Sequence, residues 1–402
     1  MKFGGTSVAD PERILAVARR LADANHAGVR VVAVLSAMGS STDELLALAR
    51  EVSPRPHERE LDMLVSVGER ISCALAAMAL IDLGQDAISL TGSQAGIVTD
   101  TAHGKAKIVE VRARRIHEAL DRGAIVLVAG FQGVSLDAEV TTLGRGGSDT
   151  TAVALAAALG ASACEIFTDV SGVFTADPRV VPDARKLEVV SYDEMLELAA
   201  SGARVLQLRS VEFARNHGVP LHVRSSFSDD EGTWVTAEED ERMLEKAIIS
   251  GVTHTLDETV YRVEGVPPAT LFAALAAAHV NVDTILRVGD EIVLSAPNED
   301  HAVAVRTLDE LGTRWTVDAE LGKVSVVGAG MKSHPGVAAT TFATLEAHGI
   351  APLIVPTSSI KIACHVRRTE VERAVKALHD AFGLDEGIPS GVEPQAVTRG
   401  GE

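Results

Sequence analysis

The chain has 402 residues, which is enough for two or three domains. Apolar residues make up 46% of it but aromatic residues only 3%, so Ala, Val, Leu and Ile must fill its core. Lys and Arg number 37 against 56 Asp and Glu, and the net charge of −19 argues against a general role on nucleic acid or on anionic membranes.

The cysteines and the apolar segments indicate in which cellular compartment the protein lies. Cys73, Cys164 and Cys364 are too far apart to form a metal-binding or redox motif. The sequence starts without an apolar segment typical of a secretion signal, and no continuous apolar run reaches the roughly 18 residues of a membrane span. We therefore expect a cytoplasmic protein with no membrane or nucleic-acid partner.

The chain opens with the turn Gly4-Gly5 beside Lys2, just ahead of a helix predicted over 11–25. Asp10 is the expected N-cap of this helix and Pro11 its first residue. A glycine turn in front of a helix N-terminus suits a phosphate group. Such turns are common, so this one indicates little by itself.

Short apolar runs alternate with helical segments through the first half of the chain. Each run is interpreted as a buried strand that ends in small or polar residues. The clearest runs are 29–35, 87–90, 125–129 and 165–167. Open α/β sheets bind ligands at the carboxyl ends of their strands. The alternation predicts a mostly parallel sheet with helices on both faces.

A long helix is predicted over 58–83, after a shorter helix whose capping box is Ser41 with Glu44. The long helix carries the pair Glu69-Arg70 among apolar neighbours. Such a pair is most often a solvated edge or a structural ion pair. The functional alternative is that the carboxylate of Glu69 faces the ammonium group of a substrate.

The most informative stretch is the turn Gly144-Arg145-Gly146-Gly147-Ser148, which runs into an Ala-rich helix. Its glycines allow close approach of a ligand to the backbone, and the helix N-terminus favours an anion. Ser148 is the expected N-cap, and Arg145 can bind a carboxylate through two parallel hydrogen bonds. The simpler alternative is a surface turn with a solvated arginine. It is not a Walker A loop, because no Gly-Lys-Ser/Thr follows.

Three segments connect the predicted sheet to the second half of the chain. Residues 170–187 form a long irregular connection, and loops of that length are usually functional or mobile. The last strand of the sheet is predicted at 220–224. The acidic stretch 225–245 has little periodicity and is interpreted as an interdomain connection.

The second half contains an internal repeat. The segment that starts at Phe272 is matched by the segment that starts at Phe342, with apolar residues at the same spacings. Each copy is predicted to run strand, helix, strand, strand, helix. Units of this βαββαβ kind bury a face by pairing with one another, and they bind small ligands more often than they catalyse reactions.

Taken together, the motifs resemble the aspartate kinases over roughly 2–387. The motifs that carry the resemblance are Lys2–Ser7, Ser36–Gly39, Gly68–Arg70, Thr91–Gly96, Gly130–Gly133, Gly144–Asp149 and Thr168–Arg179. The resemblance implies an α/β fold with an amino-acid-kinase-like, mostly parallel sheet flanked by helices, plus two ferredoxin-like βαββαβ ACT domains. It divides the chain into a catalytic domain at 1–226, a linker at 227–248, ACT domains at 249–321 and 322–388, and a tail at 389–402.

The family's reaction is the ATP-dependent phosphorylation of the β-carboxylate of L-aspartate, the first step toward lysine, threonine and methionine. The resemblance therefore implies aspartate and ATP as ligands, Mg²⁺ with the nucleotide, and lysine or threonine as effectors. It also implies a homodimer or higher oligomer through the ACT domains. Two alternatives stay open. One is a kinase acting on another amino-acid carboxylate, and the other is a non-catalytic, amino-acid-binding regulatory subunit.

The resemblance assigns roles residue by residue. Lys2 would bridge the transferring phosphoryl group, Asp149 would order Lys2, and Glu69 would bind the substrate ammonium, so these are the catalytic positions. The aspartate site would comprise Ser36, Thr42, Glu69, Arg145, Gly146, Gly147 and Ser148. The ATP site would comprise Lys2, Gly4, Gly5, Ser7, Thr168, Asp169, Phe174, Asp177, Arg179, Arg204 and Val205. The effector residues would be Asp283, Arg287, Lys332, His334, Gly336, Ser358 and Ser359.

The sequence departs from the family pattern at several positions. Phe174 replaces a usual Tyr, and Arg204 replaces a usual Lys. Only Met1 precedes Lys2, where the family has the apolar residues of a strand, so either the start codon is placed too late or Lys2 is poorly anchored. In the first repeat Pro267-Pro268 removes two N–H donors. Arg287 is expected to be buried and to repel a lysine effector unless Asp283 pairs with it, so inhibition by lysine and threonine should be weak or absent.

Overall fold

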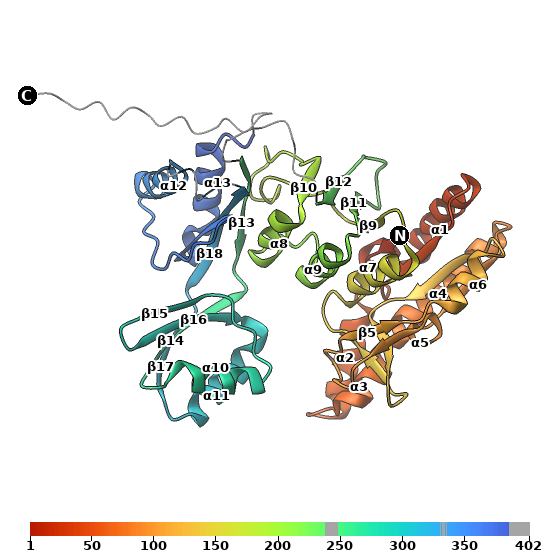
Figure 1. Cartoon of the computed structure of the whole chain (residues 1–402), viewed down its shortest axis with the longest axis horizontal. Coiled ribbons are helices and arrows are strands. Elements are labelled where there is room, and N and C mark those ends of the chain that lie inside the picture. The colour runs from red at the N-terminus through yellow and green to blue at the C-terminus, as the bar shows by residue number, and fades with distance from the viewer. Residues whose placement is uncertain (238–247, 330, 332–333, 335, 386–402) are drawn as a thin grey trace, which may run out of the picture. The chain divides into compact units, whose positions relative to one another are not determined.

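The computed structural model describes residues 1–237, 248–329, 331, 334 and 336–385 (Figure 1). The chain forms two compact units. The N-terminal unit comprises Met1–Val173, Lys186–Ala199 and Arg204–Asp240. The C-terminal unit comprises Phe174–Arg185, Ala200–Ala203 and Glu241–Glu402. Two short segments from the first half of the chain therefore belong to the C-terminal unit, which the sequence does not predict.

The N-terminal unit is built on an eight-stranded sheet in the order β10-β12-β11-β9-β1-β2-β6-β3. Its strands are β1 (Lys2–Phe3), β2 (Val32–Leu35), β3 (Ala87–Leu90), β6 (Ile125–Ala129), β9 (Cys164–Thr168), β10 (Val189–Ser191), β11 (Leu221–Ser225) and β12 (Thr233–Thr236). Among the described strands of this sheet, every neighbouring pair is parallel except β11 with β12. The predicted mostly parallel sheet is confirmed.

Strand β12 corrects the interpretation of the acidic stretch. It lies within the predicted linker 227–248, yet it pairs with β11 and β10 inside the central sheet. Leu221–Ser225 is therefore not the last strand. The acidic residues around it led to the linker interpretation, although the short strand Thr-Trp-Val-Thr consists of β-branched and aromatic residues that suit a sheet. Of this linker, 238–247 lies outside the described residues.

A second, four-stranded sheet in the order β5-β4-β7-β8 supports the glycine turn and is absent from the predicted elements. Its strands are β4 (Ile97–Thr99), β5 (Ile108–Val111), β7 (Gln132–Ser135) and β8 (Val140–Thr142). These strands have three or four residues and contain several polar ones, so their apolar pattern is weak. Long-range pairing, rather than local sequence, defines them.

The helices of the N-terminal unit largely follow the predicted pattern. They are the short turn η1 (Gly5–Val8) and α1 (Pro11–His26), α2 (Ser41–Val52), α3 (Glu58–Val65), α4 (Val67–Asp82), α5 (Gly92–Ala95), α6 (Arg114–Leu120), α7 (Gly147–Leu159), α8 (Tyr192–Ala200) and α9 (Leu208–His217). Asp10 caps α1 as expected, accepting from the Arg13 N–H at 2.9 Å. At α2 the N-cap is Ser40, one residue before the predicted Ser41, and its hydroxyl donates to Glu44.

The predicted long helix over 58–83 is two helices, α3 and α4, that meet at Ser66. The 25-residue stretch Glu58–Asp82 is long and apolar enough to span a membrane by length and composition alone. In the fold, 56% of its most apolar window is buried inside the protein, and α4 packs against α1 and β3. Its hydrophobicity is therefore accounted for by packing in the core.

The core of the N-terminal unit lies between the sheet and the helices α1 and α4. Phe3, Leu35 and Phe167 from neighbouring strands join the apolar faces of both helices, and the rings of Phe3 and Phe167 stack with centroids 4.7 Å apart. Val34 alternates with Leu35 and faces the opposite side of the sheet. There it lies beside Gly130, which adjoins α7. Helices thus cover both faces of the strands.

The C-terminal unit contains the repeat, but the two copies are nested rather than consecutive. One copy is complete within 258–318: β14 (Glu258–Glu264), α10 (Pro268–Ala277), β15 (Ile285–Val288), β16 (Glu291–Pro297), η2 (Asn298–Asp300), α11 (His301–Glu310) and β17 (Arg314–Asp318). Its four-stranded sheet has the order β15-β16-β14-β17. The other copy contains β13 (Ile248–Thr255), β18 (Leu321–Ala329), α12 (Gly336–Ala347), β19 (Lys361–Arg367), η4 (Arg368–Glu370) and α13 (Val371–Ala381).

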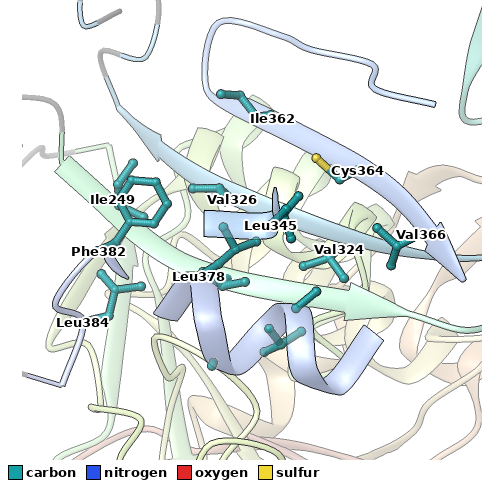
Figure 2. Packing of buried hydrophobic residues seen from close by; sticks show 14 of the residues in the cluster. Ile249, Val324, Val326, Leu345, Ile362, Cys364, Val366, Leu378, Phe382 and Leu384 are labelled. Atoms are coloured by element: carbon teal, nitrogen blue, oxygen red, sulfur yellow. The ribbon is translucent and has the colours of Figure 1, made fainter. Parts of the chain in front are cut away.

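Strand β13 shows why the nesting arises. It pairs antiparallel with β18, giving a three-stranded sheet in the order β13-β18-β19. Its side chain Ile249 packs with Val326 and Phe382 in one core (Figure 2). The placement of 249–255 in the first repeat is therefore corrected, because this strand buries its apolar face in the second. Residues 386–402, including the expected tail, lie outside the described part.

Candidate active site

The carboxyl ends of four adjacent parallel strands, β9, β1, β2 and β6, meet at one edge of the central sheet. There the chain continues into Asp169 after β9, Gly4 after β1, Ser36 after β2 and Gly130 after β6. Sequence-predicted residues that are far apart in the chain are thus brought together. An edge of this kind is where open α/β sheets bind ligands.

The turn that follows β8 has the backbone that its glycines predict. Gly144 and Gly146 have φ of +75° and +69°, the left-handed region that favours glycine, and exposed Arg145 lies between them. Gly146 precedes α7, so the expectation that Ser148 is the N-cap is wrong. Ser148 lies instead in the first turn of the helix, almost fully buried. A Cβ at Gly130 would lie 2.6 Å from its hydroxyl oxygen, so Gly130 permits this close approach.

Lys2 and Asp149 form an ion pair at the sheet edge. The Lys2 Nζ lies 2.6 Å from Asp149 Oδ1, and the exposed fractions of the two side chains are 12% and 9%. Lys2 comes from the central strand β1 and Asp149 from the first turn of α7. A Cβ at Gly4 would lie 3.5 Å from the Lys2 Nζ, in ordinary van der Waals contact, so Gly4 lies directly beside the ammonium group.

The loops after β1 and β2 are held against each other. Gly39 N–H donates to Gly5 O at 3.1 Å, and Ser36 N–H donates to Phe3 O at 3.1 Å. A Cβ at Gly5 would lie 3.1 Å from Ala37 O, so a side chain there would push these loops apart. The arrangement leaves Lys2 beside a turn lined largely by backbone.

Glu69 on α4 is a buried carboxylate with an unfilled hydrogen-bonding capacity. It is 3% exposed, and its Oε1 accepts from the Ala37 N–H at 3.3 Å. Its Oε2 has no hydrogen-bond partner among the described residues. Burial raises the pKa of Glu69 to about 7. The neighbouring Arg70 donates to Gln132 Oε1 and to Ser66 Oγ. The predicted structural pair with Arg70 is thus not what holds Glu69, and its free oxygen suits an ammonium group.

Asp62 on α3 supports the segments beside the glycine turn through hydrogen bonds, and the sequence analysis does not identify it. It is 1% exposed and accepts from the Thr142 hydroxyl at 2.5 Å, the Gly104 N–H at 3.1 Å and His103 Nδ1 at 2.8 Å. Thr142 ends β8, and Gly104 O would lie 3.1 Å from a Cβ at Gly144. Asp62 is one of four charged residues in α3, so nothing in the sequence distinguishes it, and its partners come from distant segments.

Arg209 on α9 is a second supporting residue that the sequence did not reveal. Its guanidinium donates to Leu143 O and to Ala106 O, each at 2.9 Å. Burial lowers the pKa of Arg209. Leu143 directly precedes the glycine turn, so Arg209 fixes the backbone from which the turn departs.

The expected ATP residues divide between the two units. In the N-terminal unit, the hydroxyls of Ser7 and Ser226 lie 2.6 Å apart, Thr168 Oγ1 donates to Asp169 at 3.1 Å, and Arg204 is exposed with Val205 half-buried beside it. Phe174, Asp177 and Arg179 belong to the C-terminal unit.

Asp177 and Arg179 bind each other. Arg179 Nη2 donates to Asp177 Oδ2 at 2.7 Å, and the Arg179 N–H donates to Asp177 Oδ1 at 2.9 Å. The hydrogen bonds from Arg179 lower the pKa of Asp177. These two expected nucleotide contacts are therefore one structural pair.

The expected effector residues are partly brought together. A cavity of about 260 Å³ is lined by Asp283, Thr284, Ile285, Lys323, Pro356, Thr357, Ser358, Lys361 and Ala363. Gly336 begins α12, His334 is half-buried, Ser359 is exposed, and Lys332 lies outside the described residues.

Arg287 and Asp283 differ from expectation. Arg287 is exposed and its Nε donates to Gly289 O at 3.1 Å, so it is not the buried charge that the sequence predicts. Asp283 pairs instead with buried Lys323, at 2.5 Å. Burial acts to raise the pKa of Asp283, but the Lys323 ammonium outweighs it and holds that pKa below its usual value. The pairing requires a tertiary contact between the two repeats that local spacing cannot show.

Among the described residues, no group of three or more His, Cys, Asp or Glu side chains is placed to hold a metal ion. The three cysteines are all buried and unpaired. Burial raises the pKa of each thiol.

Comparison with known proteins defines the class of protein first. Residues 1–225 match the amino acid kinase family, and residues 324–382 match an ACT domain. These two matches agree with the parallel sheet of the N-terminal unit and with the repeat that holds β18 and β19.

Individual relatives define the family more narrowly. The chain is 52% identical to the aspartokinase of Mycolicibacterium smegmatis, over 96% of this chain and 97% of that one. It is 49% identical to the aspartokinase of Geobacillus stearothermophilus, again over 96% and 97%. The solved structure of E. coli aspartokinase III in complex with aspartate and ADP, in the R-state, is 25% identical with a TM-score of 0.83, covering 95% of this chain and 99% of that chain. This chain belongs to the aspartokinase family.

Proposed function

We propose that this chain transfers the γ-phosphoryl group of ATP to the side-chain carboxylate of L-aspartate at the edge of the central sheet around Lys2, Glu69 and Asp149. Family membership supports the reaction. The observation that carries the residue assignment is the buried Lys2–Asp149 ion pair, where four parallel strands end.

Aspartate binding is assigned to groups whose charges match the two ends of the amino acid. The free Oε2 of Glu69 accepts from the ammonium group, which supplies the partner that this buried oxygen lacks. Arg145 binds the α-carboxylate through its planar guanidinium. The remaining contacts are Ser36, Thr42, Gly146, Gly147 and Ser148, which lie after β2 or around the start of α2 and α7.

Phosphoryl transfer needs positioning and charge neutralisation more than covalent help from the protein. An oxygen of the aspartate side chain bonds to the γ-phosphorus while the bond to the β,γ-bridging oxygen breaks, giving 4-phospho-L-aspartate and ADP. The Lys2 ammonium neutralises charge on the transferring group. Asp149 orients that ammonium group, because the pair lies 2.6 Å apart and is largely buried.

ATP binding is assigned to the backbone-lined turn and to residues beyond β9. Gly4, Gly5 and Ser7 lie around the phosphates, and Thr168, Asp169, Arg204 and Val205 lie toward the nucleoside. Phe174, Asp177 and Arg179 are the remaining residues that the family pattern assigns to the nucleotide. Mg²⁺ is proposed to bind with the nucleotide, with phosphate oxygens and water as most of its ligands, in keeping with the absence of a three-residue metal cluster from the described residues.

Regulation is assigned to the repeats of the C-terminal unit. We infer that 258–318 is one ACT domain and that 248–255 together with 321–385 is the other, which revises the consecutive division. The effector residues are Asp283, Arg287, Lys332, His334, Gly336, Ser358 and Ser359, with control by lysine or threonine weakened in the first repeat. A structure of E. coli aspartokinase III holds lysine and aspartate in its T-state. A homodimer or higher oligomer through the ACT domains, in the cytoplasm, completes the proposal.

The test is release of ADP from ATP and Mg²⁺ with a panel of carboxylates, with hydroxylamine added to trap an acyl phosphate. L-Aspartate should give hydroxamate in step with ADP, and Lys2→Ala should abolish both. Hydroxamate formed preferentially from another amino acid would favour a kinase of a different carboxylate. Tight amino-acid binding without ADP release would favour a regulatory subunit.

A further inference from the structure

Arg70 follows Glu69 directly on α4, yet its guanidinium is held by other groups. Its Nε donates to Gln132 Oε1 and its Nη2 donates to Ser66 Oγ, each at 3.2 Å. The Gln132 side chain closes this arrangement, because its Nε2 donates to Ser66 O at 2.7 Å. Gln132 is 2% exposed and Ser66 is 0% exposed. Arg70, Gln132 and Ser66 therefore form one hydrogen-bonded group, which we call the Arg70 cluster.

Gln132 is itself held in place by the small sheet. It begins β7 and lies opposite Thr142 of the neighbouring strand β8. A Cβ at Gly92 would lie 2.0 Å from Gln132 O, so α5 packs directly against this backbone. The amide of Gln132 is thus presented to the junction of α3 and α4 from a fixed strand. The direction of the Arg70 side chain is set by this tertiary contact.

Glu69 differs from Arg70, because half of its carboxylate is unfilled. Its Oε1 accepts from the Ala37 N–H at 3.3 Å. A Cβ at Gly68 would lie 2.7 Å from Ala37 Cβ, so the glycine lets α4 approach this loop closely. The Oε2 of Glu69 is buried and has no hydrogen-bond partner among the described residues. A buried acceptor without a partner is unfavourable, so a cation within reach is attracted to it.

Arg70 is the cation that acts on Glu69. Burial raises the pKa of Glu69 to about 7, and the Arg70 charge opposes that effect. Successive residues on a helix point in different directions, so the two side chains do not pair by default. Cys73 is the other titratable group of α4 that Glu69 affects, and Asp62 of α3 is occupied by its own hydrogen bonds. Helix α1 and the strands β2, β3 and β6 meet α4 through apolar side chains.

We propose that Gln132 is a positioning residue that holds Arg70 away from Glu69 and so keeps Oε2 of Glu69 open for the ammonium group of the substrate. This inference rests on the proposed function in assigning that ammonium group to Glu69. A released Arg70 guanidinium would pair with Oε2 and compete with the substrate for the same acceptor. Gln132 therefore acts through Arg70, without touching aspartate itself. Every residue of the argument belongs to the N-terminal unit.

The first experiment measures both KM values of the full chain over a range of pH. Gln132→Met keeps the length of the side chain but removes both polar groups that hold the Arg70 cluster. KM for aspartate should rise about ten-fold, while KM for ATP stays within about two-fold. In the parent chain the fall of KM for aspartate with rising pH is centred near the Glu69 pKa of about 7. In the variant this midpoint should move down by about one pH unit or more, because a paired guanidinium favours the ionised carboxylate.

Tyr192→Phe is the matched control. Its hydroxyl is a buried donor to a backbone carbonyl, Val219 O at 2.7 Å, in another part of the same unit. Its loss should change neither KM for aspartate nor the pH midpoint. A rise in KM for Gln132→Met without movement of the midpoint, or the same rise for Tyr192→Phe, would show a general loss of structure and overturn the positioning role.

A second comparison tests whether Gln132 acts through Arg70. Arg70→Met removes the competing cation, so KM for aspartate should stay within about two-fold of the parent value and the midpoint should not fall. In the double variant Arg70→Met with Gln132→Met, the second substitution should have no further effect on either quantity. A ten-fold rise of KM on adding Gln132→Met to Arg70→Met would contradict the proposal.

Ser66→Ala provides the test if Gln132→Met does not fold. It removes the hydroxyl that accepts from Arg70 Nη2, and should move the midpoint in the same direction by a smaller amount. An unmoved midpoint in that variant would overturn the inference. Glu69→Gln separates it from the proposed function. If Glu69→Gln leaves KM for aspartate unchanged, the assignment of the ammonium group to Glu69 fails. If it raises that KM while folded Gln132→Met moves neither KM nor midpoint, only the role of Gln132 fails.

Discussion

Glu69→Gln is the most informative single change, because it removes a buried charge while keeping the shape of the side chain. Burial raises the pKa of Glu69 from about 4.5 to about 7. Between these pH values the folded protein holds a proton that the unfolded chain has lost, so this group destabilises the fold progressively as pH rises. The cost above pH 7 is roughly 3 kcal/mol, at about 1.36 kcal/mol for each pKa unit.

We therefore expect Glu69→Gln to unfold at a higher temperature than the parent chain at pH 8 and at a similar temperature at pH 5. The measurement is thermal unfolding followed by circular dichroism at both pH values without ligands. Glu60→Gln is the matched control, since Glu60 lies one helix earlier with its side chain 65% exposed. It should leave the unfolding temperature nearly unchanged at both pH values.

The same substitution should damage aspartate binding. A hydrogen bond to a charged group contributes about 1.5–3 kcal/mol, so KM for aspartate should rise roughly ten- to hundred-fold. KM for ATP should stay within about two-fold. In the parent chain KM for aspartate should fall as pH rises through about 7, because the ionised carboxylate accepts a stronger, charge-assisted hydrogen bond from the ammonium group than the neutral acid does. An unchanged KM for aspartate would refute the assignment of Glu69, even if the variant proved more stable.

Four further outcomes test the rest of the site. Lys2→Ala should lower kcat at least hundred-fold with small changes in KM, in single-turnover and steady-state assays. Arg145→Lys should raise KM for aspartate about ten-fold and leave KM for ATP unchanged, and equal effects on both would contradict a carboxylate clamp. Asp62→Asn should lower the unfolding temperature by the equivalent of about 1–3 kcal/mol and raise KM for aspartate, because the turn after β8 loses its anchor. Calorimetric titration with lysine and threonine should still show weak or absent binding without loss of the oligomer, because Pro267 and Pro268 remove two N–H donors from the first repeat even though Arg287 is exposed. Micromolar binding that lowers activity would contradict this.

The central sheet could be predicted because its strands are continuous apolar runs, such as Val32–Leu35 and Ile125–Ala129, buried on both faces. Two shorter strands, one in this sheet and one in the four-stranded sheet, could not be predicted. Strand β8 has three residues, and β12 lies in an acidic stretch, so neither shows an apolar pattern of its own. Strand β13 was assigned to the wrong repeat because strand pairing is non-local, and its partner β18 begins only after the whole inserted copy.

In the candidate site, too, the sequence predicts which residue types matter but does not predict their tertiary partners. Glycine positions carry their own signal, and Gly144 and Gly146 do adopt the left-handed backbone that the turn requires. The sequence also marks Glu69 as an unusual charge in an apolar helix. The sequence does not show that Oε2 of Glu69 lacks a hydrogen-bond partner among the described residues, or that Asp62 accepts a hydrogen bond from the Thr142 hydroxyl. Both facts depend on segments that only the fold brings together.

The interleaving of the two units limits how this enzyme can be dissected. A chain ended just after β12 would keep the segment 174–185 but would lose β13 and α13. Thr175 would then lose both the Val252 N–H and His379, and the apolar side chains Ala176 and Val181 would lose the core in which they are buried. Such a fragment would keep the eight-stranded sheet but would leave the segment 174–185 without the contacts that hold it in the whole chain.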